Sequence, residues 1–211
     1  MEVKVGETNT SSTLRRDMEY LGDVLDKVLL YEGGKSLLDR IQKIRTLSIK
    51  VRETGDSEAN DQLKQEISSL EPAVRTNVIR SFSVYLQLVN IAEQNYRSRR
   101  RREYQSEDTS LIQPGSLEDG VNKLQENGVT PEMVSNLLET LSLELIITAH
   151  PTEATRRTIL QIHKRIADLL KAWDYAFTRH EKNIIDETIF NEVMILGETT
   201  EITEKKPSVS N

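Results

Sequence analysis

The sequence predicts a mainly α-helical protein, and three observations lead to this fold class. Apolar residues recur every three or four positions through most of the chain, which is the spacing of one buried helix face. Glycine and proline fall mainly between these periodic stretches, where they are typical of helix ends and helix starts. Apolar residues make up only 36% of the 211 residues and charged residues 29%, which favours helices with solvated outer faces over a thick buried sheet.

The first half of the chain predicts four helices. Residues 1–13 are polar and rich in Ser and Thr, so we expect them to be disordered. A helix from Leu14 ends at Gly33-Gly34, since glycine tolerates a left-handed turn, and a second helix covers residues 37–51. Residues 53–61 are either a solvated connector or the start of a short third helix. Pro72 suits the first turn of a long fourth helix, whose apolar stripe comprises Val74, Val78, Phe82, Tyr85, Val89, Ala92 and Tyr96.

An arginine-rich stretch ends the long helix and two short helices follow it. We expect Arg97 and residues 99–102 to be a solvated helix end, with an anion-binding or inter-subunit role as the alternative. Pro114-Gly115 breaks the chain, and Ser116 with Asp119 then predicts the cap of a short helix that Gly128 closes. Thr130-Pro131 predicts the start of the next helix.

Residues 143–149 predict about one β-strand, because the segment is short, contains two adjacent isoleucines and stops before Pro151. The alternative is the last turn of the preceding helix. Two further helices are expected between Pro151 and Leu196, and residues 197–211 read as an irregular tail. A lone apolar strand must pair with something, so its partners are expected on other polypeptide.

Composition excludes several classes of function. The chain contains no cysteine, so it has no disulfide, thiolate metal site or cysteine nucleophile. Its net charge of −6 argues against general nucleic-acid binding. No segment is apolar enough for a signal peptide or a membrane span, so a soluble, cytoplasmic protein is expected.

His150 lies between the expected strand and a helix that we expect to begin at Pro151. A residue before proline favours extended backbone, so His150 ends the strand. Free N–H groups at a helix start, its positive dipole end and nearby cations favour a bound anion. Thr152, Arg156 and Arg157 lie in the first two turns expected, so the pattern predicts an oxyanion or phosphate site. On spacing alone, a structural turn at His150 remains the alternative, and no histidine spacing indicates a metal site.

Residues 147–158, ITAHPTEATRRT, resemble the first signature of phosphoenolpyruvate carboxylases. That signature is Thr-Ala-His-Pro-Thr-Glu/Gln, two free positions, an arginine and a basic residue. Residues 33–52 and 88–102 are similar to two helical segments of the same family, in the family's order. Residues 196–203, LGETTEIT, depart from the family's Leu-Trp-Gln-Thr-Asp-Glu-x-Arg pattern. The resemblance therefore divides the chain into residues 1–13, a family-like part at 14–196, and a divergent tail at 197–211.

The resemblance implies the helical N-terminal part of an α/β-barrel enzyme, with residues 143–149 as one of its eight barrel strands. It implies a carbon dioxide-fixing lyase that converts phosphoenolpyruvate and bicarbonate to oxaloacetate and phosphate, an anaplerotic reaction that feeds the tricarboxylic acid cycle. His150 is then the catalytic residue that handles carboxyphosphate. Thr152, Arg156 and Arg157 would bind the anion or support a subunit contact. Family members use Mg²⁺ or Mn²⁺, whose ligands match no residue of this chain, and assemble as homotetramers.

Because family members are several times longer than this chain, we expect an N-terminal fragment that is inactive alone. It would be a truncated product or one half of an enzyme completed by a C-terminal partner chain. The alternative is a helical interaction module that has kept a docking surface of the family and lost catalysis.

Overall fold

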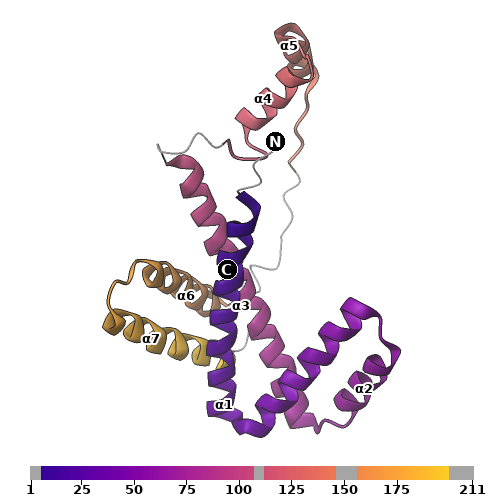
Figure 1. Ribbon diagram of the computed structural model, residues 1–211, viewed down its shortest axis with the longest axis vertical. Coiled ribbons are helices and arrows are strands. Elements are labelled where there is room, and N and C mark those ends of the chain that lie inside the picture. The colour runs from indigo at the N-terminus through magenta and orange to yellow at the C-terminus, as the bar shows by residue number, and fades with distance from the viewer. Residues whose placement is uncertain (1–5, 107–111, 146–155, 200–211) are drawn as a thin grey trace, which may run out of the picture. The chain divides into compact units, whose positions relative to one another are not determined.

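The computed structural model describes residues 6–106, 112–145 and 156–199, and most of these are helical (Figure 1). The predicted mainly α-helical fold class is confirmed, and no strand occurs within the described ranges. The chain divides into two compact units, one formed by residues 1–95 with 154–211 and the other by residues 96–153. The two units differ in how many of their described apolar side chains are buried.

Helix α1 (Gly6–Thr54) contains the predicted break between the first two helices. Gly34 has φ 69° and ψ −179°, a backbone conformation that only glycine adopts readily, and it kinks the helix. The helix begins inside the segment 1–13 that was expected to be disordered, whereas residues 1–5 lie outside the described part. Leu21 and Val28 on the first arm and Ile44 on the second are buried.

Helices α2 (Ser57–Ser68) and α3 (Pro72–Gln105) follow, and the short-helix reading of residues 53–61 is confirmed. Asp56 caps α2 by accepting hydrogen bonds from the N–H groups of Glu58 and Ala59 at 2.9 and 3.2 Å. Pro72 is the first residue of α3, as predicted.

The predicted apolar stripe of α3 is only partly right. Val78 and Ala92 are buried, whereas Val74, Phe82, Tyr85 and Val89 are half-buried. The prediction, which used apolar residues alone, missed two polar residues on the buried face of α3. Ser81 donates to the carbonyl of Val78 at 2.7 Å, and Asn95 donates to the Asp17 carboxylate at 3.4 Å. The buried face comprises Val78, Ser81, Val84, Leu88, Ile91, Ala92 and Asn95.

Helices α6 (Arg157–Tyr175) and α7 (Arg179–Glu198) lie side by side, and α7 also contacts α1 (Figure 1). Thr178 and Glu181 form a capping box at the start of α7. One continuous hydrophobic core joins these helices to α1 and α3. Its fully enclosed side chains include Leu21, Val28, Leu88, Ile159, Ile162, Ile166, Ile189, Val193 and Leu196.

The second unit contains the end of α3 and two short helices, α4 (Leu117–Glu126) and α5 (Pro131–Thr140). Both predicted caps are confirmed: Ser116 accepts from the N–H of Asp119, and Thr130 accepts from the N–H of Met133. Gly128 has φ 71°, as expected of a residue that closes a helix. No residue of α4 or α5 is buried.

The expected strand at 143–149 is described only over its first three residues, and the rest lies outside the described ranges. Helix α5 ends at Thr140, and Leu141 has extended backbone (φ −70°, ψ 121°). The alternative reading, a last helical turn continuing through Leu143, is therefore wrong. Residues 141–145 are neither helix nor strand. The strand stays a prediction, as does the division of the chain at residues 13 and 196.

Candidate functional site

Of the four predicted site residues, the structure places Arg156 and Arg157 at the start of α6. His150 and Thr152 lie outside the described residues. Helix α6 begins at Arg157, because Arg156 has extended backbone with φ −60° and ψ 137°. The expectation that a single helix runs from Pro151 through both arginines is corrected: they occupy the N-cap and the first helical position of α6. Residues 151–155, where the expected helix start lies, are outside the described ranges.

The start of α6 carries positive charge, and the described residues supply no ion-pair partner for Arg156 or Arg157. The first turn contains no acidic residue, and the Arg156 side chain makes no capping hydrogen bond. The Nε atom of Arg156 is buried and has no hydrogen-bond partner within the described ranges. Cations at the positive end of a helix oppose its dipole, so this arrangement is unfavourable for the helix alone. A bound anion would offset this cost, because the positive end of the helix and the charges of the two arginines both attract it.

Contacts with the neighbouring helices α7 and α3 hold α6 in place. Arg165 forms a two-pronged ion pair with Glu192 of α7, at 2.6 and 2.8 Å. His163 lies 2.7 Å, Nε2 to Oε1, from Gln87 of α3. Beneath them Ile159 and Ile162 are fully enclosed in the core. The packing of α6 against these helices therefore fixes the direction of its first turn.

A second polar cluster joins α1 to α3, α6 and α7. Arg16 donates to Asp17 at 2.8 Å and to Asp174 at 2.7 Å. Tyr20 donates to the Asp186 carboxylate at 2.5 Å. Burial raises the pKa of the Tyr20 phenol far above its usual range, and the hydrogen bond to Asp186 raises it further. Sequence reasoning missed this cluster and the Arg165 pair, because no local spacing connects residues on different helices.

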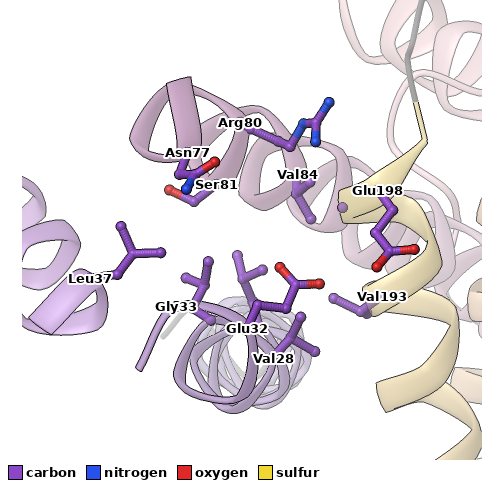
Figure 2. A pocket seen from close by; sticks show the side chains of 13 residues that line it. Val28, Glu32, Gly33, Leu37, Asn77, Arg80, Ser81, Val84, Val193 and Glu198 are labelled. Atoms are coloured by element: carbon purple, nitrogen blue, oxygen red, sulfur yellow. The ribbon is translucent and has the colours of Figure 1, made fainter. Parts of the chain in front are cut away.

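A cavity of about 350 Å³ lies between α1, α3 and α7 (Figure 2). Figure 2 shows Glu32 of α1 and Glu198 of α7 at one side of it, with Arg80 of α3 nearby. Partial burial raises the pKa of Glu32, the Glu198 carboxylate raises it further, and Arg80 acts in the opposite direction. Neither Arg156 nor Arg157, the two predicted site residues that the structure describes, lines this cavity.

Three of the five arginines at the end of α3 fit the predicted solvated helix end, since Arg97, Arg101 and Arg102 are exposed. Arg99 and Arg100 are half-buried, and the two terminal nitrogens of Arg99 are buried. Arg100 contacts Glu103 at 3.0 Å, hydrogen-bonds to the Tyr104 hydroxyl and lies over the Tyr104 ring, 4.6 Å from its centre. These contacts are local to the helix, so they support the solvated reading over an anion site.

Two absences apply to the described residues only. There, no group of three or more His, Asp or Glu side chains is arranged to hold a metal ion. Nor does any helix in those ranges have the length and apolar content needed to cross a membrane. The described residues therefore contain no site that fits the Mg²⁺ or Mn²⁺ that the resemblance implies.

Comparison with known proteins matches residues 14–211 to the family described as phosphoenolpyruvate carboxylase. The chain is 35% identical over 201 residues to the phosphoenolpyruvate carboxylase of Alcanivorax borkumensis, which covers 95% of this chain and 22% of that protein. The enzyme of Xanthomonas oryzae is 36% identical over 170 residues, 80% of this chain and 19% of that one. The enzyme of Gloeobacter violaceus is 33% identical over 197 residues, 93% and 20% of the two chains. The chain thus spans about a fifth of the length of these relatives.

Proposed function

Since the chain belongs to the phosphoenolpyruvate carboxylase family, we propose that it supplies the N-terminal helical part of a phosphoenolpyruvate carboxylase, with His150 as its catalytic residue. That enzyme joins bicarbonate to phosphoenolpyruvate and yields oxaloacetate and phosphate. The observation that carries the proposal is the match over residues 14–211, which includes His150 and the arginines after it.

His150 is proposed to act on the carboxyphosphate that forms when bicarbonate attacks the phosphoryl group of phosphoenolpyruvate. The imidazole accepts the carboxyl proton of carboxyphosphate, which then releases carbon dioxide and leaves phosphate. Carbon dioxide joins the enolate of pyruvate to form oxaloacetate. An imidazole with a pKa of about 6.5 can accept and return a proton near neutral pH.

Thr152, Arg156 and Arg157 are proposed to bind the phosphoryl or carboxyl oxygens beside His150. Support comes from the uncapped start of α6, where two arginines lie at the positive end of the helix and the Nε atom of Arg156 is buried without a partner in the described part of the chain. Phosphoryl transfer depends mainly on positioning and on neutralising charge, and these groups can provide both. A divalent cation adds charge neutralisation when bound, and we assign it to no residue of this chain.

The proposal is tested in a chimera in which this chain replaces the aligned N-terminal part of the Alcanivorax borkumensis enzyme. Oxaloacetate formation is measured with phosphoenolpyruvate, bicarbonate and Mg²⁺. His150→Ala is expected to lower kcat by about a hundredfold or more, the usual contribution of a positioned proton-transfer group. Arg156→Ala is expected to raise KM for phosphoenolpyruvate about tenfold, since it removes one charged hydrogen-bond donor.

His180→Ala is the matched control, because His180 is exposed in the first turn of α7, and it should leave kcat and KM unchanged. Circular dichroism checks that each variant folds. Wild-type turnover in the His150→Ala chimera would disprove the catalytic assignment. The 211-residue chain assayed alone should form no oxaloacetate above background.

The alternative function, a helical interaction module without catalysis, is favoured by the exposed apolar side chains of α4 and α5. It predicts a folded chimera that has no turnover even with His150 intact. The same measurement therefore separates the two functions.

A further inference from the structure

We propose that the cavity between α1, α3 and α7 binds a small aromatic amine in its ammonium form (Figure 2). The aromatic ring lies on the apolar floor of the cavity, and the ammonium group lies between two carboxylates. All the residues that line the cavity belong to the first unit. The site is independent of the proposed function, since it is built from α1, α3 and α7 alone.

The floor of the cavity is aliphatic and deeply buried. None of its side chains is more than 6% exposed, and they come from three helices: Leu25, Val28, Leu29, Val84 and Val193. Small-molecule sites in proteins have volumes of about 300 Å³ or more and combine apolar walls with a few polar groups. The cavity of about 350 Å³ fits this description, so its floor can hold the ring of a small ligand.

Gly197 leaves the cavity open near the end of α7. It lines the cavity, and a Cβ atom added to it would meet no atom of a neighbouring helix within 4 Å. The family pattern that residues 196–203 depart from has a tryptophan at this position, whereas this chain has a glycine. The absent side chain therefore leaves room for a ring the size of an indole.

The charged side chains that line the cavity sum to one negative charge. Glu32 and Glu198 lie at one side of it and Arg80 lies nearby (Figure 2). Within the described ranges neither carboxylate forms an ion pair or accepts a hydrogen bond. Partial burial and the Glu198 carboxylate both raise the pKa of Glu32, so the ionised pair is unfavourable without a further cation.

A ligand with a single positive charge complements this arrangement. Its ammonium group can donate hydrogen bonds to both carboxylates, and such charge-assisted bonds are stronger than neutral ones. An anion would meet two carboxylates and one guanidinium group, and an uncharged ligand would leave the carboxylates unpaired. The cavity therefore favours a monocation that carries an aromatic ring.

The test is isothermal titration calorimetry of the 211-residue chain with tryptamine, which is an ammonium ion at pH 7. We expect one tryptamine to bind per chain. Glu32→Gln and Glu198→Gln should each weaken binding about tenfold, since each removes a charged hydrogen-bond acceptor. Gly197→Trp should abolish binding, because its ring takes the space of the ligand, whereas Gly197→Ala should retain it.

Matched variants and ligands separate this site from general effects. Gly120→Trp places the same ring in open space on α4, and Glu139→Gln removes an exposed carboxylate from α5, so both should bind tryptamine like the wild type. Ethylindole has a similar body without the charge and should bind at least about tenfold more weakly than tryptamine. The anionic analogue indolepropionate should not bind.

Three results would overturn the inference: no binding at millimolar tryptamine, equal binding of ethylindole, or undiminished binding to a folded Gly197→Trp chain. Equal losses in Glu139→Gln and Glu32→Gln would also overturn it, because the ammonium group would then respond to the overall charge of the chain. Circular dichroism checks that each variant folds. If Gly197→Trp does not fold, the two cavity glutamine variants decide the outcome by themselves.

Discussion

The two units of the chain differ in how much apolar surface they bury. Among the described residues, all the buried hydrophobic side chains lie in the first unit, where α1, α3, α6 and α7 enclose a continuous core. Helices α4 and α5 of the second unit have strong apolar faces and no buried residue. Folding is driven mainly by apolar burial, so the first unit has a driving force of its own. Helices α4 and α5 have no such driving force among the described residues.

The polar contacts differ between the units in the same way. In the first unit they join distant segments, such as Arg165 to Glu192 and His163 to Gln87. In the second unit the contacts named above stay within a few residues, as in the Lys123–Asp119 pair and the Ser116 cap. Local contacts stabilise a helix but do not fix its tertiary position. The difference can be measured by placing matched substitutions in both units.

Truncating a core side chain should produce the largest effect and separate the units most clearly. Ile162 of α6 is fully enclosed, so Ile162→Ala should lower the free energy of unfolding by about 3 kcal/mol. Leu138→Ala removes an exposed side chain of α5 and should change it by less than about 0.5 kcal/mol. Urea unfolding followed by fluorescence of Trp173, the single tryptophan, measures both. Equal losses would show that the second unit contributes to the same core.

Removing the half-buried Tyr20 hydroxyl should have the next largest effect. Tyr20 donates to Asp186, and Tyr20→Phe should cost about 2 kcal/mol because a carboxylate loses its donor. Tyr104→Phe in the second unit removes a contact with Arg100 that is local to one helix, so it should leave cooperative unfolding unchanged. Circular dichroism is the suitable probe, since the Tyr20 ring lies 5.5 Å from the Trp173 ring and would alter its fluorescence.

The stability difference between the wild type and Tyr20→Phe should change with pH in a defined direction. The pKa of Tyr20 is raised in the folded state, so the unfolded chain loses this proton first as the pH rises. The stabilisation is fully present below about pH 10, the ordinary tyrosine value, and declines above it. The stability difference between wild type and Tyr20→Phe should therefore narrow at pH 11. A constant difference would show that the Tyr20 proton is not linked to folding.

Two threonine helix caps allow a closer comparison of the units. Thr178 caps α7 within a capping box, and Thr178→Ala should cost about 1 kcal/mol in the unfolding of the first unit. Thr130 caps α5 through the N–H of Met133, and Thr130→Ala should reduce helix content locally without changing that unfolding transition. Amide hydrogen exchange distinguishes local from global opening. Faster exchange throughout the first unit in Thr130→Ala would contradict the separation.

Much of the fold could be predicted because its signals are local. The break at Gly34, the start at Pro72 and the caps Ser116 and Thr130 each depend on residues within one turn. The buried face of α3 was predicted less well, because Asn95 is buried through a bond to Asp17, 78 positions away. The spacing of apolar residues along one helix does not predict a hydrogen bond between residues on two different helices.

The candidate site was predicted as residue types but not as geometry. The segment 148–157 predicts His150 and the arginines as site residues, whereas the extended backbone of Arg156, which makes α6 begin at Arg157, has no signal in the sequence. The contacts that hold α6, from Arg165 and His163, come from α7 and α3 and have no counterpart in the motif. The chemistry of the site therefore stays a prediction from the sequence, whereas the contacts that orient α6 are found only in the packed helices.

The smallest expected effect is a gain in stability at the cavity between α1, α3 and α7. Glu32 faces Glu198 there, and its pKa is raised by partial burial and by that second carboxylate. A carboxyl group with a raised pKa stabilises the fold at low pH and loses that contribution as the pH rises above about 4.3. Glu32→Gln should therefore stabilise the first unit at pH 7, by less than about 0.5 kcal/mol after solvent screening, and have no effect near pH 4. Glu139→Gln, on exposed α5, is the matched control and should be neutral at both pH values. A loss of stability in Glu32→Gln at pH 7 would instead mean that attraction to Arg80 outweighs the repulsion between the two carboxylates.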